Sequence, residues 1–417
     1  MNKMKLGDIA EIQSGPFGTQ LHKNEYVSSG VLMLNAKNIG NGVILTDSVD
    51  YVSEAVCKRL PRYILKKGDI LFGRAGSIER HTYVDNDYVG CFQGTNCIRI
   101  RCDNSDIARY ISYYLWLPEL KKIIENQTGG SILSYITTDL LENIVVDLPD
   151  ENIIKKVNYT LQLIERKIRL NAAINDNLQQ QLKLMYDYWF TQFDFPNEDG
   201  KPYRSSGGKM VWNAEIKRDI PENWSVKRLD NLSRFRNGIN YSKSETGNKQ
   251  YRIVNVRNIT SSTLLIDELD CDLINLQYSQ AENYILHPSD IIIARSGSPG
   301  ATRLMPHPSS STIFCGFIIC CSPYEEKYRD YLYCWLKQFE GTHATQTGGS
   351  ILQNVSQDTL KSLPVVMPDD DILEKFNAFM ESTIRVIEKC TKENQSLISL
   401  RDWLLPMLMN GQATITD

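Results

Sequence analysis

The sequence has no long apolar run. No segment approaches the ~20 consecutive apolar residues that a membrane-spanning helix needs, and the first residues, Met1 to Ile9, contain no apolar stretch of signal-peptide length. These absences argue against a membrane protein and against a secreted one. We therefore expect the chain to stay in the cytoplasm and to have no membrane partner.

The sequence is also poor in residues spaced for metal binding. It has five histidines, which are scattered, and its ten cysteines form no Cys-x-x-Cys pair. Structural zinc sites usually need cysteines or histidines two to four residues apart. We expect no metal in this chain, and we expect the cysteines to be buried, reduced thiols.

Catalytic and cofactor motifs are missing as well. No glycine-rich cofactor fingerprint follows a strand, and no His-Glu-x-x-His or Asn-Pro-Pro-aromatic motif is present. A nuclease-like set can be assembled from Asp150, Glu165 and Lys167. On one helix, however, Asp150 and Glu165 would lie ~22 Å apart, too far for one metal site. We predict no catalytic residue and no cofactor in this chain.

The overall charge is a weak argument against nucleic-acid binding. The 417 residues carry a net charge of −4, and 42% apolar and 23% charged residues are typical of a globular protein. Basic residues nevertheless gather in two runs, 58–80 and 227–257. Such runs fit either a polyanion-binding face or an ordinary solvated face, and the sequence leaves both open.

The chain is internally duplicated. The heptapeptide Gln-Thr-Gly-Gly-Ser-Ile-Leu occurs at Gln127–Leu133 and at Gln346–Leu352, a shift of 346 − 127 = 219 residues. That shift is far longer than the roughly 20–50 residues of a solenoid or propeller repeat. Other matching pairs are Asn35–Ile39 with Asn255–Ile259, Asp69–Ser77 with Asp290–Ser298, Gly15 with Gly238, and Leu6 with Leu229. Two versions of one module are therefore predicted.

Each half is predicted to be an α+β module followed by a long helix. Apolar runs bounded by Gly, Asn and Ser favour strands at Val31–Leu34, Asp69–Phe72, Ile253–Val256 and Asp290–Ile293. Amphipathic helices packed on a sheet are expected at Ile107–Leu117 and Tyr328–Phe339. The fold class is thus α+β, with two pseudo-repeated α/β domains separated by two long helices.

The long helices carry apolar stripes with alternating spacings of three and four residues, which is typical of a coiled coil. We expect the two helices to pair with each other, with Asn171 and Asn175 setting the register. At roughly 39 residues, each would span about 58 Å and act as a spacer. The alternative is that each stripe packs on its own module. The predicted helix–helix contacts are Leu161, Ile164, Ile168, Leu178, Leu182 and Met185 with Phe379, Val386, Leu397, Leu400 and Leu404.

The composition shifts place the boundaries. The expected parts are a first globular domain at 1–150, a helix at 151–192, a connector at 193–223, a second globular domain at 224–369, a helix at 370–411 and a tail at 412–417. Pro149-Asp150 and Pro368-Asp369 stand where N-cap aspartates belong. The connector contains Tyr203, Met210, Val211 and Trp212, which indicate that it docks on a domain.

Two strand ends offer groups suited to DNA. Gly73–Ser77 and Ala294–Gly300 each combine an arginine, glycines and a hydroxyl, and arginine can fork onto guanine while glycine lets backbone N–H groups approach phosphates. An ordinary tight turn with a surface arginine is the alternative. The candidate DNA-contacting residues are Lys37, Arg74, Ser77, Arg80, Gln127, Thr128, Ser131, Arg236, Arg257, Arg295, Ser298, Arg303, Gln346, Thr347 and Ser350.

These features together resemble the specificity subunit of type I restriction–modification systems. The resemblance covers essentially the whole chain and rests on the ordered set: Asp-Ile…Arg-x-Gly-Ser strand ends, Thr-Gly-Gly-Ser-Ile segments before a Pro-Asp helix start, the connector Gly200–Met210, and Arg401–Gly411. The chain departs from the pattern at Glu151-Asn152 and Asp370-Asp371, where Glu-Gln is common. The first half also has no counterpart of Ile220-Pro-Glu-Asn-Trp224.

The resemblance implies a non-catalytic subunit of a restriction system that reads double-stranded DNA. Two target-recognition domains would each read one half of a bipartite, asymmetric sequence, with centres about one helical turn apart. The two long helices would form an antiparallel coiled coil, which holds the domains apart and docks two methyltransferase subunits carrying S-adenosylmethionine. Restriction/translocase subunits, which use ATP and Mg²⁺, would join through them.

Two other function classes remain open from the residues alone. One is a pseudo-symmetric protein–protein adaptor without DNA specificity. The other is a nuclease or methyltransferase acting alone, which the absence of a catalytic constellation disfavours.

Overall fold

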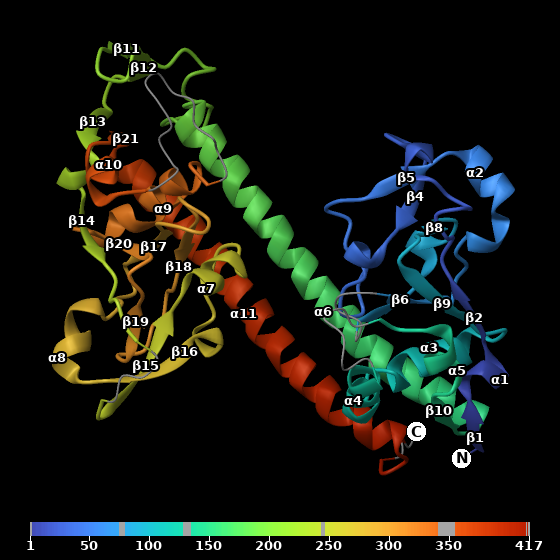
Figure 1. Cartoon of the computed structure of the whole chain (residues 1–417). Helices are drawn as coiled ribbons and strands as arrows, with labels where there is room; N and C mark the ends of the chain where they lie inside the picture. The colour runs from blue at the N-terminus through green and yellow to red at the C-terminus, as the bar shows by residue number, and fades with distance from the viewer. Residues whose placement is uncertain are drawn as a thin grey trace. The chain divides into compact units, whose positions relative to one another are not determined.

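The computed structural model of the chain describes residues 2–74, 80–127, 135–242, 247–340, 355–413 and 415, with side chains 125–127 left out. The chain divides into two compact units (Figure 1). Unit 1 comprises Met1–Asn171 with Lys392–Asp417, and unit 2 comprises Ala172–Thr391. Below, domain 1 means the part of unit 1 that precedes helix α6, and domain 2 means residues 224–369 of unit 2.

The sheets of domain 1 are mixed with short helices. Its strands are β1 (Asn2–Lys5), β2 (Glu11–Ser14), β3 (Tyr26–Val27), β4 (Val31–Leu34), β5 (Asp50–Val52), β6 (Ile70–Gly73), β7 (His81–Tyr83), β8 (Phe92–Gln93), β9 (Cys97–Arg101) and β10 (Val145–Leu148). Its helices are α1 (Leu6–Ile9), α2 (Glu54–Arg59), α3 (Ser105–Tyr114), α4 (Pro118–Gln127) and α5 (Thr138–Glu142).

Three sheets organise domain 1. Strands β2-β9-β6-β7 form an antiparallel four-stranded sheet, and β3-β5-β4-β8 form a second one in which β4 and β8 run parallel. Strand β1 pairs antiparallel with β10, in the register Asn2↔Leu148. The first strand of the domain therefore lies beside its last strand.

Unit 2 contains the equivalent elements. Its strands are β11 (Met210–Asn213), β12 (Arg218–Pro221), β13 (Ser225–Arg228), β14 (Ser233–Asn237), β15 (Lys249–Val254), β16 (Asp272–Leu276), β17 (Ile291–Ala294), β18 (Thr302–Leu304), β19 (Thr312–Phe314), β20 (Ile318–Pro323) and β21 (Pro364–Met367). Its short helices are α7 (Val256–Thr260), α8 (Tyr278–Ala281), α9 (Arg329–Lys337) and α10 (Gln357–Lys361).

The topology of domain 2 repeats that of domain 1. The sheet β14-β20-β17-β18 matches β2-β9-β6-β7, and β16-β15-β19 matches β5-β4-β8, including the parallel pair β15–β19. Strand β13 pairs with β21, as β1 pairs with β10. The predicted duplication and the α+β fold class are confirmed. The expected strand at Ile253–Val256 ends early, because Val256 already begins α7.

The two long helices are α6 (Glu151–Tyr186), which continues as a π-helical turn (Asp187–Thr191), and α11 (Asp370–Met409). The carboxylate of Asp150 accepts a hydrogen bond from the N–H of Ile153 at 3.1 Å, so it caps α6 as expected. Helix α6 begins in unit 1 and ends in unit 2, whereas α11 does the reverse.

The helices pack against each other inside each unit. In unit 1, the buried amide of Asn171 donates to Glu393 Oε2 (2.8 Å) and Asn394 Oδ1 (2.9 Å). In unit 2, Asn175 Nδ2 donates to Thr391 Oγ1 (3.2 Å). The partner's number falls as the number in α6 rises, so the helices run antiparallel. Both asparagines lie where a register-setting role was predicted for them.

The apolar stripe of α6 matches its prediction more closely than that of α11. Leu161 shares an apolar cluster with Leu405 and Leu408, and Ile164 is also buried. Leu182 belongs to the domain 2 cluster with Phe376 and Met380 of α11. The remaining predicted contacts that are at least half-buried are Ile168, Leu178, Met185, Phe379, Leu397 and Leu404.

The predictions for Val386 and Leu400 are wrong, because each side chain is 43% exposed. The inward positions beside Val386 are Ile384 and Ile387. Val386 directly precedes Ile387, and each residue turns an α-helix by about 100°, so the two side chains leave the helix on different faces.

The connector docks on domain 2, as its aromatic content indicated. Phe193 and Phe195 are buried in the apolar cluster that contains Trp224 of domain 2, and Tyr203 and Met210 pack against it. Val211 and Trp212, which were expected to dock as well, are exposed on β11. Among the described residues, no helix combines the length and apolar character needed to cross a membrane.

Candidate nucleic-acid interface

Arg74 stands at the end of a buried strand, as the sequence indicated. It directly follows β6, whose four residues are all buried. Its N–H donates to the carbonyl of Asn96 (2.8 Å), and its own carbonyl accepts from the N–H of Ile136 (3.1 Å). The guanidinium carbon lies 5.8 Å from the centre of the Phe17 ring. The backbone is therefore fixed, while the guanidinium lies at a surface cleft.

This cleft has a volume of about 600 Å³ and lies entirely within domain 1. It brings together Lys37 and Arg74, which are 37 residues apart in the sequence (74 − 37). Its lining is Pro16, Phe17, Gly18, Leu21, Lys23, Tyr26, Asn35, Ala36, Lys37, Asp50, Arg74, Thr95 and Asn96. Three basic groups, two amides and two aromatic rings therefore surround a single carboxylate.

Lys37 is oriented by a polar cluster next to β4. Its Nζ lies 3.0 Å from Asp50 Oδ2, and the amide of Asn35 donates to the same oxygen (2.9 Å). The N–H of Asn35 donates to Asn38 Oδ1 (3.0 Å), and buried Asn38 holds the carbonyls of Leu45 and Ser48. The cluster fixes the turn, but the lysine side chain is 44% exposed and free to reach outward.

Domain 2 repeats this cluster with an arginine. Arg257 Nη2 lies 2.6 Å from Asp272 Oδ1, and the amide of Asn255 donates to Asp272 Oδ2 (2.9 Å). The N–H of Asn255 donates to Asn258 Oδ1 (2.8 Å). Two asparagines, one aspartate and one basic side chain therefore surround the same turn in both domains.

Arg295 is the domain 2 counterpart of Arg74, and its side chain is exposed. Its N–H donates to the carbonyl of Phe317 (2.9 Å). In the loop that follows, Gly297 and Gly300 adopt positive φ values of 79° and 83°, a region that side chains disfavour. Ser298 lies between them, half-buried, and its carbonyl accepts from the N–H of Ala301. The loop shape thus needs its glycines.

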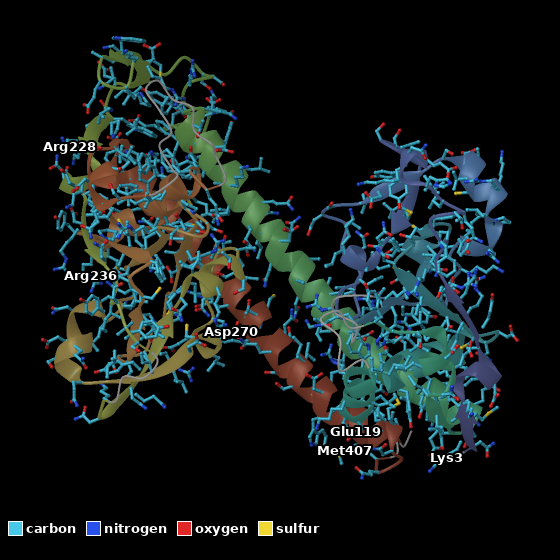
Figure 2. The ribbon with its side chains drawn as sticks, in the orientation of Figure 1. Lys3, Glu119, Arg228, Arg236, Asp270 and Met407 are labelled. Atoms are coloured by element: carbon cyan, nitrogen blue, oxygen red, sulfur yellow. The ribbon has the colours of Figure 1, made fainter. Side chains whose placement is uncertain are left out.

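Arg236 does not take the interface role expected of it. Its guanidinium donates to buried Asp290 Oδ2 (2.7 Å) and to the carbonyl of Asn283 (2.9 Å), and only 15% of the side chain is exposed. Figure 2 locates it on domain 2. A buried carboxylate needs such a partner, so Arg236 is structural.

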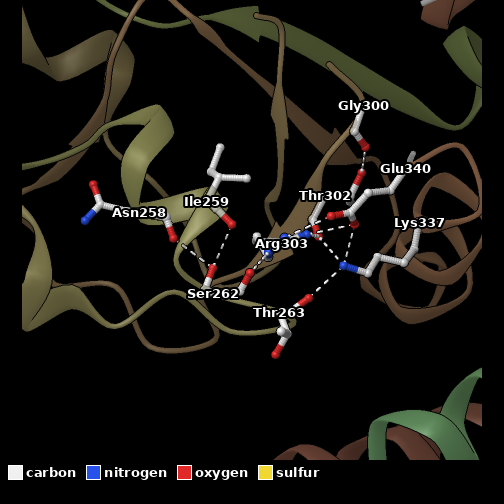
Figure 3. Close-up of polar contacts among 9 residues, drawn as sticks. All are labelled: Asn258, Ile259, Ser262, Thr263, Gly300, Thr302, Arg303, Lys337 and Glu340. Carbon is white, nitrogen blue, oxygen red and sulfur yellow. Dashed lines mark hydrogen bonds and ion pairs between the residues drawn. The ribbon is translucent and has the colours of Figure 1, made fainter. Parts of the chain in front are cut away.

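Arg303 is likewise structural. It forks onto both carboxylate oxygens of Glu340 at 2.9 Å and donates through Nε to the carbonyl of Ser262 (2.7 Å), as Figure 3 shows. Lys337 joins the cluster by donating to the carbonyl of Thr263 (2.7 Å). Burial raises the pKa of Glu340, but the hydrogen bonds from Arg303 and Lys337 outweigh it and hold that pKa below its ordinary value. The network ties β18, α9 and the segment after α7 together.

The other predicted residues add little geometry. Arg80 precedes β7 and is half-buried. Gln127 ends α4, but its side chain is outside the described set. The candidates Ser77, Thr128, Ser131, Gln346, Thr347 and Ser350 lie outside the described residues.

Sequence reasoning missed Phe17, Asn35, Asp50 and Asn96, all of which line the cleft. Asn35 belongs to the duplicated Asn-x-Lys/Arg-Asn segment, and that recurrence was the available signal. For Phe17 and Asn96 no motif exists, because only the folded chain places them beside Arg74.

A larger cleft in unit 1, of about 750 Å³, is less suited to a polyanion. It lies against α6 and the end of α11, and its basic residues Lys121, Arg169 and Arg401 are offset by Glu165 and Asp402. The cleft beside Arg74, in which basic side chains outnumber acidic ones, is the better candidate for a polyanion-binding site.

The described residues offer no obvious redox or metal chemistry. No group of three or more His, Cys, Asp or Glu among them could hold a metal ion. All ten cysteines are unpaired, and all but Cys102 are buried. Burial raises the pKa of Cys91 to about 11 and that of Cys97 to about 12, so these thiols stay protonated and inert at neutral pH. His81 is buried too, which lowers its pKa to about 3 and keeps it neutral.

The sequence matches one family model twice. The model for the type I restriction modification DNA specificity domain covers residues 1–180 and 221–397. Each match contains one domain and most of the helix that follows it.

Individual relatives are similar over their whole length. The specificity subunit of the type I restriction enzyme HindI from Haemophilus influenzae is 24% identical, with 98% of each chain covered. The MjaIX specificity subunit from Methanocaldococcus jannaschii is 21% identical, over 99% of this chain and 93% of the relative. The crystal structure of the type I restriction–modification S subunit from M. genitalium superposes with a TM-score of 0.57 at 15% identity, covering 98% of this chain and 95% of that one. The last likeness concerns the fold.

Proposed function

Because the chain belongs to the type I restriction–modification DNA specificity family, we propose that each of its two domains reads one half of a two-part DNA sequence through the surface around its strand-end arginine, Arg74 or Arg295. The chain determines which DNA sequence is methylated and cleaved, and partner subunits catalyse both reactions. Its own role is binding and positioning.

The proposal rests on one group of side chains that recurs in both domains: a strand-end arginine and a nearby ion pair. Domain 1 presents Arg74 beside the Lys37–Asp50 pair, and domain 2 presents Arg295 and the Arg257–Asp272 pair at the equivalent positions. A lysine or arginine paired with an exposed carboxylate gains little from that pair in water, so phosphate can replace the carboxylate at small cost. The strand-end arginine then remains for base edges.

The two half-sites differ in this proposal, and the target is asymmetric. The shared scaffold holds the same turn with lysine in domain 1 and with arginine in domain 2. A point charge and a planar fork recognise different geometries. The loops that follow the strand-end arginines also differ in sequence.

Partner subunits dock on the long helices in this proposal. Two methyltransferase subunits with S-adenosylmethionine would bind α6 and α11, and restriction/translocase subunits with ATP and Mg²⁺ would join through them. The support is a set of large apolar side chains that the helices leave exposed: Tyr159, Leu163, Leu170, Leu184, Val386, Leu400 and Trp403. Exposed apolar surface of this extent is typical of interaction sites.

Footprinting of the chain assembled with its cognate methyltransferase tests DNA reading. We expect two protected patches separated by an unprotected spacer. One continuous patch, or none, contradicts the proposal.

Salt dependence separates DNA reading from a protein–protein adaptor. Binding through several phosphates weakens steeply between roughly 50 and 200 mM salt, because released counterions drive it. An affinity for duplex DNA that does not change over this range would favour the adaptor. Native mass spectrometry of the assembled complex then counts the methyltransferase subunits, for which we expect two.

A further inference from the structure

Each strand-end arginine has the same backbone neighbours in both domains. The N–H of Arg74 donates to Asn96, as that of Arg295 donates to Phe317. A Cβ built on Gly15 would lie 2.0 Å from the Gly94 carbonyl, and one on Gly238 would lie 2.1 Å from the Cys315 carbonyl. Gly94 stands two residues before Asn96, and Cys315 stands two residues before Phe317. Asn96 is therefore equivalent to Phe317, and, counting on from the glycines, Phe17 is equivalent to Asn240.

An aromatic ring and an amide have exchanged places between these positions. In domain 1 the first loop carries Phe17 and the second carries Asn96; in domain 2 the first carries Asn240 and the second carries Phe317. All four side chains are exposed, with Phe17 at 56% and Phe317 at 63%. Both domains thus keep one ring and one amide beside the arginine but reverse their order.

The two loops of each pair lie against each other. The amide Oδ1 of Asn240 would be only 2.0 Å from a Cβ built on Gly316, the residue before Phe317. In domain 1, Phe17 and Asn96 line the same cleft, and the ring of Phe17 lies next to the Arg74 guanidinium. Ring, amide and arginine therefore form one continuous surface in domain 1.

The chemistry of these groups matches base edges. An asparagine amide can donate to N7 and accept from the N6 amino group of adenine, while an apolar side chain contacts the thymine methyl group. The amide could also donate to a phosphate oxygen, but the phenyl ring has no hydrogen-bond donor and cannot. An exposed phenyl ring gains from leaving water, so it favours contact with an apolar base surface.

We propose that the ring–amide pairs Phe17/Asn96 and Asn240/Phe317 are specificity-determining elements, in which the amide reads adenine and the ring contacts a thymine methyl group. Their reversed order reverses the order of the two contacted base pairs relative to the arginine. This inference rests on the proposed function, because it names residues that would give each half-site its sequence.

The test uses the chain assembled with its cognate methyltransferase and a library of DNA in which both half-sites are randomised. Sequencing of the methylated products gives the base preference at each position. For Asn96→Ala we expect discrimination at one adenine position to fall roughly tenfold or more. For Phe17→Ala we expect discrimination at one thymine position to fall by roughly 10-fold, in line with the loss of one methyl contact. Both changes should leave the half-site read by domain 2 intact.

The reciprocal variants Asn240→Ala and Phe317→Ala should alter only the other half-site. Tyr324→Ala is the matched control for Phe317→Ala, because Tyr324 is 64% exposed and stands at the opposite end of β20. The two residues are separated by about 23 Å at ~3.3 Å per strand residue. Tyr324→Ala should leave both half-sites unchanged.

The outcomes separate the inference from the function on which it rests. If the wild-type complex methylates no two-part sequence, the proposed function fails. If it does, and the four variants keep every base preference, the inference fails and the function stands. A uniform fall in methylation with unchanged preferences would give these residues a structural role and would also overturn the inference.

Discussion

Asp69 and Asp290 are buried at equivalent positions in the two domains, yet arginines from different strands neutralise them. Asp69 is paired with Arg101 of β9 through two contacts of 2.7 Å, whereas Asp290 is paired with Arg236 of β14. At the position equivalent to Arg101, domain 2 has Ser322, which also donates to Asp290. A buried carboxylate requires a partner but does not fix which strand supplies it.

The role of a single basic residue is therefore hard to derive from the sequence. Arg74, Arg236 and Arg303 look alike in the chain, but only Arg74 faces a surface cleft. The acidic partner of Arg236 is 54 residues away and that of Arg303 is 37 residues away, so no local pattern reveals either pair. The duplicated motif identified Arg74 and Arg295. The basic runs, in contrast, also included Arg236, whose charge is used in an internal ion pair.

At the readout positions, we expect Arg74→Ala to impair recognition of one half-site and Arg295→Ala the other. A bidentate base contact is worth about 1–3 kcal/mol of discrimination. Methylation of DNA libraries by the assembled complex measures the change. Arg228→Ala is the control, because Arg228 is exposed and pairs with its neighbour Asp230. Unchanged methylation for both readout variants would show that these loops do not read DNA.

Arg303→Met should destabilise unit 2 by about 3 kcal/mol at neutral pH, since it leaves the half-buried Glu340 without its forked partner. The pKa of Glu340 is lowered in the folded state, so its pairing stabilises the fold above the ordinary glutamate pKa and is lost as pH falls through the lowered value. The gap between wild type and variant should therefore shrink below about pH 4. Urea unfolding at pH 7 and at low pH measures it; a gap that stays constant would assign the loss to packing.

Among the elements, the loops that carry the readout residues are held by backbone contact. Gly15 and Gly238 pass directly over the carbonyls of the neighbouring turns, where no side chain fits. That requirement is visible in the sequence only as two matching glycines. The strands and the long helices were easier to derive, because periodicity of two or of three to four residues reports burial directly.

Gly15→Ala should disturb domain 1 and weaken recognition of its half-site, because the added methyl group would meet the Gly94 carbonyl. Overpacking of this kind costs typically about 1–3 kcal/mol. Gly18→Ala is a close control, since a Cβ at Gly18 meets nothing within 4 Å. The thermal unfolding temperature should fall for Gly15→Ala alone, and half-site methylation is compared between Gly15→Ala and the wild type. Equal effects of both variants would contradict this account.

The errors on α11 have a local cause. Val386 and Leu400 follow a regular spacing from Phe379, but the inward face is occupied by Met380, Ile384 and Ile387. Their exposure places apolar side chains on the outer face of the helix, where partner subunits are proposed to bind. The exposure of these residues contradicts their predicted helix–helix contacts and supports the proposed docking of partner subunits.

For the whole molecule, α6 forms a continuous connection between the two units. Inserting seven residues at matched levels of α6 and α11 adds about 10.5 Å of helix. At 3.4 Å per base pair, the unread spacer of the target should lengthen by about 3 bp while both half-sites stay the same. Methylome sequencing of a host expressing the variant measures the spacer. A changed half-site would contradict the spacer role of the helices.

The paired end strands β1–β10 and β13–β21 mean that the chain enters and leaves each domain at adjacent points. A segment whose ends meet can be replaced by a homologous one without stretching or crowding its attachments. Genetic recombination with breakpoints in these strands would replace one whole domain and leave the long helices and the other domain unchanged. The host could thereby acquire a new methylation pattern in one exchange, and the partner subunits of the proposed complex would need no adaptation.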